Sequence, residues 1–178
     1  MTSNRAAFVS VDGLDPSTVI ATARAALNSR VEGGISHWDA SGVFHELAVA
    51  GDAAGRPSAR TLLLLYAADL AFRLRWEIRP TLAEGRSVVA APYVDTAVAF
   101  GRAAGLKAGW LAALFRFAPR AAERRFAPPG SALAGTVTDG LVGFSCDRMG
   151  FAPGSAERRD LVERVTAELR RASRRSAR

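Results

Sequence analysis

The residues best placed for chemistry near the start of the chain form a turn between an apolar run and an amphipathic segment. The turn reads Asp12-Gly13-Leu14-Asp15-Pro16-Ser17-Thr18. A phosphate-binding loop occupies such a position, because consecutive backbone N–H groups, a helix N-terminus and a lysine meet the phosphate oxygens there. Here Pro16 removes one N–H donor, and the chain's single lysine, Lys107, lies far along the sequence. The turn therefore predicts the position of a phosphate loop without the groups that hold phosphates.

The sequence gives weaker evidence for a metal site or a disulfide than for a phosphate loop. Asp12 and Asp15 could hold a magnesium ion beside phosphates, but without phosphates their spacing is typical of a turn and a helix cap. His37 and His45 are eight residues apart with no cysteine nearby, which fits none of the usual metal-ligand spacings. Cys146 is the only cysteine, so an intramolecular disulfide is excluded. We therefore expect no metal site and no catalytic residue.

The composition indicates one globular domain. The 178 residues are 49% hydrophobic and 23% charged, with a mean hydropathy of +0.07. These values exclude a disordered chain, a coiled-coil rod and a collagen-like repeat. The longest apolar stretch, 62–68, is far shorter than the roughly 20 residues that cross a bilayer, and the N-terminus lacks the apolar core of a signal peptide. We therefore expect a single domain over 1–178, in the cytoplasm and without membrane contact.

The charge is strongly positive, with a net value of +7 and 24 basic residues of which one is lysine. The many arginines and alanines together indicate the amino-acid composition of a GC-rich genome. Net charge by itself does not specify a function. The basic tail over 172–178 follows the last helical pattern and is typical of a solvated helix end. We therefore do not expect nucleic acid as the partner.

The elements that must position these residues alternate between strand-like and helix-like patterns. Expected strands cover 8–11, 35–38 and 87–91, with shorter ones at 134–137 and 141–145. Expected helices cover 17–27, 43–49, 58–83, 94–104, 108–117 and 155–171. Alternation of this kind predicts an α/β domain in three layers, with a central, mostly parallel sheet flanked by helices. The strands at 8–11 and 87–91 are expected to be adjacent and parallel at the centre.

The helical pattern over 58–83 is apolar around more of its circumference than one sheet face can cover. The uncovered side predicts a homodimer, or a hetero-oligomer, through the helix 59–79. Pro80 lacks an N–H and is expected to interrupt or kink this helix.

Four segments of the middle of the chain carry a family resemblance. They are 62–69 (Leu-Leu-Leu-Leu-Tyr-Ala-Ala-Asp), 78–89 (Ile-Arg-Pro-Thr-Leu-Ala-Glu-Gly-Arg-Ser-Val-Val), 93–100 (Tyr-Val-Asp-Thr-Ala-Val-Ala-Phe) and 105–111 (Gly-Leu-Lys-Ala-Gly-Trp-Leu). Their order and spacing resemble bacterial thymidylate kinases (dTMP kinases), which are P-loop nucleoside monophosphate kinases. Those enzymes carry Leu-Leu-Phe-Ala-Ala-Asp-Arg, Ile-Arg-Pro-x-Leu-x-x-Gly, Ser-x-x-Ala-Tyr and Gly-Leu-x-x-x-Trp-Leu segments. The resemblance covers about residues 8–117 and fades beyond them.

The resemblance implies a P-loop kinase-like fold and two sets of site residues. A vestigial phosphate loop would comprise Asp12, Gly13, Asp15, Ser17 and Thr18. A nucleoside pocket would comprise Tyr66, Asp69, Arg73, Tyr93, Asp95 and Phe100. The residues of this implied nucleoside pocket could equally persist as core and supporting residues.

The departures from the family pattern remove the phosphate-binding groups. The Gly-x-Gly-Lys part of the loop is missing between Asp15 and Ser17, and Leu70 replaces the arginine after Ala-Ala-Asp. Ala91 and Pro92 replace the Asp-Arg pair before the tyrosine, and the divergent, loop-rich segment 118–156 shows no arginine-rich lid. Phosphoryl transfer depends on positioning and positive charge, so these losses predict a degenerate member without catalysis.

Three functions follow from the resemblance and its departures. The first is an inactive, thymidylate-kinase-like binding, scaffold or regulatory subunit. The second is a nucleotide-binding module with a weakly bound ligand such as dTMP. The third is an atypical kinase that transfers phosphate from ATP to dTMP, and only this one would need ATP and magnesium. For the first function we expect no cofactor.

Overall fold

The computed structural model describes residues 6–28, 32–130 and 140–177. Four parallel strands form the sheet of this described part, in the order β2-β3-β1-β4. They are β1 (Phe8–Asp12), β2 (Gly33–His37), β3 (Ser87–Ala91) and β4 (Glu123–Phe126). Because all four run the same way, their carboxyl ends meet at one edge of the sheet.

The two central strands are buried along their whole length. Every residue of β1 and of β3 is buried, as expected for parallel strands that are covered on both faces. Phe8 lies opposite Val88 and Ser10 lies opposite Ala90. The predicted central, adjacent and parallel placement of 8–11 and 87–91 is therefore confirmed.

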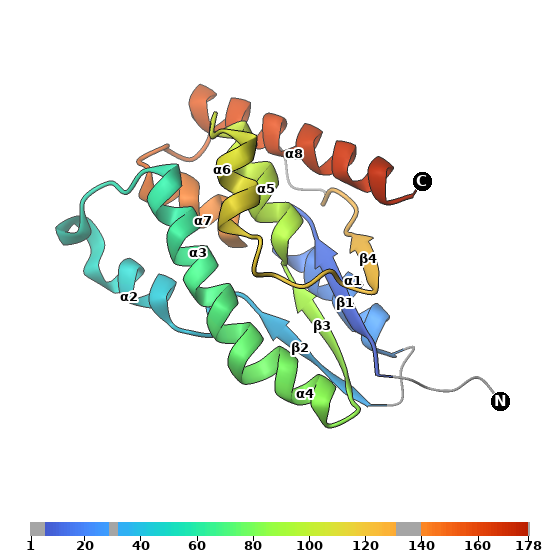
Figure 1. Ribbon diagram of the computed structural model, residues 1–178. Helices are drawn as coiled ribbons and strands as arrows, with labels where there is room; N and C mark the ends of the chain where they lie inside the picture. The colour runs from blue at the N-terminus through green and yellow to red at the C-terminus, as the bar shows by residue number, and fades with distance from the viewer. Residues whose placement is uncertain (1–5, 29–31, 131–139, 178) are drawn as a thin grey trace.

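Helices cover both faces of the sheet, which gives three layers (Figure 1). On one face lies α1 (Pro16–Asn28). Its residues Val19, Ala23 and Ala26 pack against the side chains of β1 and β3 that point toward this face. The larger core lies on the other face and buries the side chains of the remaining long helices. These are α3 (Ala59–Arg73), α5 (Val94–Ala103), α7 (Gly140–Arg148) and α8 (Ala156–Ser176), with α2 (Val43–Ala50) and α6 (Ala108–Leu114) beside them. The predicted three-layer α/β architecture is confirmed.

The long helical pattern continues past α3 without a break. A π-helical turn, Leu74–Ile78, joins α3 to α4 (Arg79–Ala83), and the N–H of Arg79 reaches back to the carbonyl of Leu74. The wide turn precedes Pro80, which lies near the start of α4 where a missing N–H is tolerated. The expected interruption at Pro80 therefore takes the form of a change in helix type.

The segment 118–156 differs from the sequence prediction. The predicted strand at 141–145 is wrong, because these residues form part of α7. Its buried residues are Leu141, Val142, Gly143, Ser145 and Cys146, a helical spacing that a short apolar run does not reveal. Strand β4 was not predicted, since its Glu-Arg-Arg-Phe sequence carries three charges at the edge of the sheet. The predicted strand at 134–137 lies outside the described residues.

Candidate functional site

The loop between β1 and α1 is short, and its own side chains satisfy the start of α1. Asp15 accepts hydrogen bonds from the backbone N–H of Thr18 at 2.9 Å and from the hydroxyl of Ser17 at 2.5 Å. These bonds hold the pKa of Asp15 below its usual range, with the Ser17 hydroxyl as the main cause. A carboxylate therefore occupies the helix end at which a phosphate group would otherwise be favoured.

Asp12, the last residue of β1, ties this strand to the start of α5. It is fully buried. Its Oδ1 accepts hydrogen bonds from the N–H of Tyr93 at 3.0 Å, the N–H of Thr96 at 2.8 Å and the hydroxyl of Thr96 at 2.8 Å. The N–H of Gly13 points to the same Thr96 hydroxyl at 3.1 Å. The carboxylate of Asp12 therefore connects the end of β1 to the residues that follow β3.

The other oxygen of Asp12, Oδ2, is buried and has no hydrogen-bond partner. Burial raises the pKa of Asp12 to about 6, and the negative charge of Asp95 adds to the rise. The hydrogen bonds from Thr96 and Tyr93 act in the opposite direction and are outweighed. The folded chain therefore holds this carboxylate at an energetic cost near neutral pH.

The crevice between the carboxyl ends of β1 and β3 is where an open α/β sheet of this topology usually binds ligands, because the chain leaves these strands toward opposite faces. In this structure the start of α7 closes it with Leu141 and Val142, which are both almost fully buried. Only about 20 Å³ of space remains between the β1–α1 loop, His37, Trp38, Pro92 and Thr96. A nucleotide does not fit this space.

Four residues of the implied nucleoside pocket lie in the core and contact protein groups. Tyr66 is fully buried and donates its hydroxyl to the carbonyls of Pro92 at 3.1 Å and Tyr93 at 2.6 Å. Phe100 is fully buried among apolar side chains. Burial raises the pKa of the Tyr66 hydroxyl far above its usual value, so this group acts as a donor.

Asp69 and Arg73 are also fully buried and hold neighbouring loops. Asp69 accepts hydrogen bonds from the N–H groups of Asp39 and Ser41 at 3.0 and 2.9 Å. Arg73 donates to the hydroxyl and carbonyl of Ser36, at 3.0 and 2.7 Å, and to the carbonyl of Pro92. Both side chains thus fix the carboxyl ends of β2 and β3.

The remaining two residues of the implied pocket, Tyr93 and Asp95, line a cavity of about 150 Å³ on the α5 side of the sheet. Asp95 forms an ion pair with Arg124 of β4 at 2.6 Å. The hydroxyl of Tyr93 donates to the carbonyl of Pro119 at 2.7 Å. The structure therefore brings Tyr93 and Asp95 together at this cavity, and Tyr93 also belongs to the core that holds Tyr66 and Phe100.

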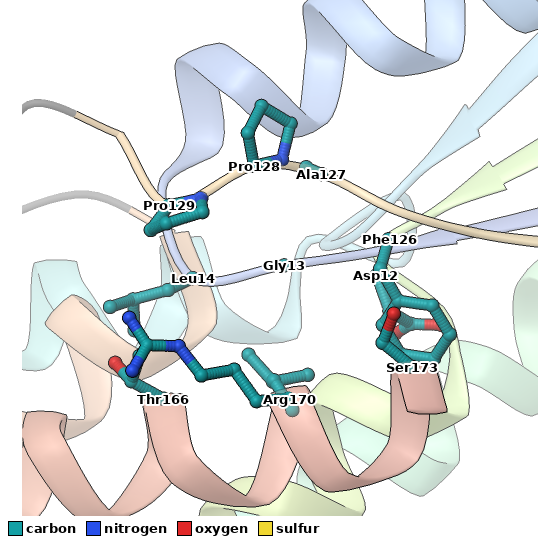
Figure 2. Close-up of a pocket in the computed structure, with 11 residues that line it drawn as sticks. Asp12, Gly13, Leu14, Phe126, Ala127, Pro128, Pro129, Thr166, Arg170 and Ser173 are labelled. Carbon is teal, nitrogen blue, oxygen red and sulfur yellow. The ribbon is translucent and has the colours of Figure 1, made fainter. Parts of the chain in front are cut away.

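A larger cavity of about 220 Å³ opens on the opposite side of Asp12 and Gly13, between the ends of β1 and β4 and the helix α8 (Figure 2). Its apolar walls come from Leu14, Phe126, Ala127, Pro128, Pro129 and Leu169. Its polar groups from α8 are Thr166, Arg170 and Ser173. Sequence reasoning singled out the turn that supplies Asp12 and Gly13 but missed the cavity, since its other walls come from the end of β4 and from α8, which carry no recognisable motif.

Neither Lys107 nor a cluster of metal-ligating side chains lies beside the loop in the described part of the chain. Lys107 is exposed at the start of α6 and lines none of these cavities. Among the described residues no three His, Cys, Asp or Glu side chains gather in a way that could hold a metal ion. Asp15 accepts protein hydrogen bonds through Oδ2, and Asp12 accepts them through Oδ1. No helix within the described ranges is long and apolar enough to cross a membrane.

Comparison with known proteins supports the fold. No family model and no curated protein matches the sequence. Among solved structures, the thymidylate kinase of Ehrlichia chaffeensis is similar, with a TM-score of 0.66 and 12% sequence identity. The match covers 96% of this chain and 82% of that enzyme. At this identity the likeness shows the fold alone, and the fold of this chain is therefore an α/β architecture like that of a thymidylate kinase.

Proposed function

We propose that this chain is a non-catalytic protein with a thymidylate-kinase-like fold, and that it acts as a binding or scaffold subunit. The observation that carries the proposal is the closed crevice between β1 and β3. Asp12 bridges it by three hydrogen bonds, and Leu141 and Val142 fill the space above. A kinase must hold a phosphate donor and an acceptor in line in a crevice of this kind.

Electrostatics support the same proposal. The transition state of phosphoryl transfer carries negative charge that cations and N–H groups must stabilise. Here the start of α1 faces the carboxylate of Asp15, and the start of α5 faces the carboxylate of Asp12. The buried guanidinium of Arg73 is bound to Ser36 and Pro92. The two helix starts are thus occupied by the protein's own carboxylates. Arg73 donates from Nε and Nη2 to protein acceptors, while its buried Nη1 has no partner.

The catalytic test is an assay of ATP-dependent dTMP phosphorylation with the purified chain. We expect no turnover above a mock preparation, while an active thymidylate kinase added to the same sample turns over normally. Neither ATP nor dTMP should raise the melting temperature, since a ligand that binds only the folded state must raise it. Turnover that disappears in Asp15→Ala would sink the proposal, and a ligand-dependent rise without turnover would favour a nucleotide-binding module.

The binding surface that we propose is the outer face of α3 and the π-helical turn. Leu64, Ala68, Phe72 and Trp76 follow one another at four-residue spacing and are all exposed. Trp76 is 61% exposed and Leu64 is 50% exposed. Large apolar side chains that form a continuous exposed stripe are typical of an interface, and we propose a second copy of this chain as the partner.

Sedimentation at micromolar concentration tests the dimer. We expect a mass of twice 18.8 kDa for the native chain and a monomer for Trp76→Glu. Val49→Glu is the control, because Val49 is also apolar, is 72% exposed and belongs to α2, not to the stripe. A native monomer would contradict self-association, and a dimer that survives Trp76→Glu would place the interface elsewhere.

A further inference from the structure

The cavity between β1, β4 and α8 carries opposite charges at its two ends. Figure 2 shows Asp12, Phe126 and Ser173 grouped at one end. The guanidinium of Arg170 lies at the other end, beside Leu14 and Thr166. The cavity of about 220 Å³ exceeds the roughly 150 Å³ that holds a benzene-sized molecule.

The inner end offers an unused acceptor. Asp12 is fully buried, and its Oδ1 takes all three hydrogen bonds that the carboxylate accepts. Its Oδ2 is buried and unpartnered. A buried carboxylate oxygen without a donor is costly, so a cationic donor placed there is strongly favoured. The raised pKa of Asp12 is consistent with a site that lacks its positive partner.

The outer end offers an unused cation. Arg170 is exposed and forms neither an ion pair nor a side-chain hydrogen bond with any described residue, unlike its neighbour Arg171, which pairs with Glu168 at 2.6 Å. The hydroxyl of Thr166 is already donated to the carbonyl of Val162. A guanidinium at a cavity mouth is well suited to a carboxylate, which it can hold through two parallel N–H bonds.

The walls between the two ends are apolar. Phe126, Pro128 and Leu169 form most of the passage, and Ala127 and Pro129 complete it. Along α8, Ser173 and Thr166 mark the two ends and are seven residues apart, which corresponds to about 10 Å of helix. The passage therefore suits a short aliphatic chain.

From these three features we propose that the cavity binds a compact zwitterion of the ω-amino acid class. Its ammonium group would donate to Oδ2 of Asp12, its methylene chain would lie against Phe126 and Leu169, and its carboxylate would pair with Arg170. The side chain of Phe126 is partly buried and lies 5.7 Å from the Arg124 guanidinium, so the ammonium group enters only if this ring turns and gives up that contact. The site is separate from the closed crevice and does not depend on whether the chain is catalytic.

Three probes of similar length separate the two ends of the site. ε-Aminocaproate carries both charges, hexylamine carries only the ammonium, and caproate carries only the carboxylate. Calorimetry at pH 7 should give saturable binding of ε-aminocaproate that is about tenfold or more tighter than that of either single-charge probe. γ-Aminobutyrate, which is too short to reach both ends, should bind more weakly than ε-aminocaproate.

Two variants assign the ends, and a third serves as the matched control. Asp12→Asn keeps an oxygen for Tyr93 and Thr96, and should lose about tenfold or more in affinity for ε-aminocaproate and hexylamine but not for caproate. Arg170→Gln should weaken ε-aminocaproate and caproate but not hexylamine. Arg174→Gln removes the same charge one turn further along α8, outside the cavity, and should change none of them.

Circular dichroism of each variant confirms that it is folded before its binding is compared. The absence of saturable binding of ε-aminocaproate to the native chain would overturn the proposal. So would equal binding of all three probes, or binding that is unchanged in both folded variants.

Discussion

The β1–α1 loop separates two regions that share the same carboxylate but differ in how they are filled. On the β3 side, Oδ1 of Asp12 accepts three hydrogen bonds and about 20 Å³ of space remains. On the β4 side, Oδ2 has no partner and the cavity measures about 220 Å³. The space beside Asp12 is therefore small on the β3 side and large on the β4 side.

The β3 side shows how carboxylates can occupy helix N-termini that would also suit phosphates. A carboxylate at a helix N-terminus satisfies the same N–H groups and the same dipole that a phosphate would satisfy. Asp15 does this for α1, and Asp12 does it for α5. Both helix starts are therefore stabilised by carboxylates of the chain itself.

The largest expected effect comes from removing the shared carboxylate. Asp12→Ala leaves two buried N–H groups and one hydroxyl without an acceptor, and should cost about 3 kcal/mol or more in the free energy of unfolding. Asp12→Asn keeps the acceptor oxygen on the β3 side and should cost much less. Urea unfolding of both variants measures the difference.

Equal losses for Asp12→Ala and Asp12→Asn would contradict this assignment. The charge, and not the hydrogen bonds of the β3 side, would then be what the fold requires.

A smaller effect concerns the charge of Asp12. Its pKa is about 6 in the folded chain and near 3.8 in the unfolded chain, so the folded state binds the proton more readily. The contribution of Asp12 to stability is therefore fully present below about pH 4 and is lost as the pH rises through about 6, a change of about 3 kcal/mol. Subtracting the pH profile of Asp12→Asn from that of the native chain isolates this term from the other carboxylates.

A difference profile that is flat between pH 4 and pH 7 would mean that Oδ2 is solvated or partnered in solution. In that case the contrast between the two sides of the carboxylate would not hold. Binding of ε-aminocaproate should also flatten the profile, since an ammonium beside Oδ2 favours the charged form.

Much of the fold could be predicted from the sequence, because its strongest patterns are local. The buried runs of β1 and β3 and the capped helix α8 follow directly from apolar spacing and from Ser155 as a helix cap. Strand β4 was not predicted because three of its four residues are charged. Such a sequence is compatible with a strand only at the edge of a sheet, and the sequence alone does not show where that edge lies. The strand prediction at 141–145 was wrong because helix α7 begins with seven apolar or small residues. A run of this kind fits the two-residue period of a strand as well as the 3.6-residue period of a helix.

The candidate site was predicted only in part, since its decisive contacts join distant segments. Asp12 and the capping role of Asp15 follow from the turn sequence. The closure by Leu141 and the lining by Arg170 join residues more than 120 positions from the loop, and no local pattern marks them. The resemblance implied Tyr66 and Arg73 as nucleoside-pocket residues, with core packing as the alternative. Both are buried and hydrogen-bonded beside the end of β3, and whether any nucleoside contacts them stays a prediction.

The smallest effect tests how tightly the loop fits between the two regions, because Gly13 lines both of them. A Cβ at Gly13 would lie 2.8 Å from a methyl group of Val19 and 2.9 Å from the Cβ of Ala127. Both neighbours are fixed to α1 and to the end of β4, so Gly13→Ala should cost about 1–3 kcal/mol. Gly34→Ala is the control, since a Cβ there meets nothing within 4 Å and alanine is no worse than glycine in a strand. Thermal unfolding measures the stability of both variants. Equal stability would mean that the loop can shift to accept a Cβ, so that the contacts of Gly13 do not fix its position between the crevice and the cavity.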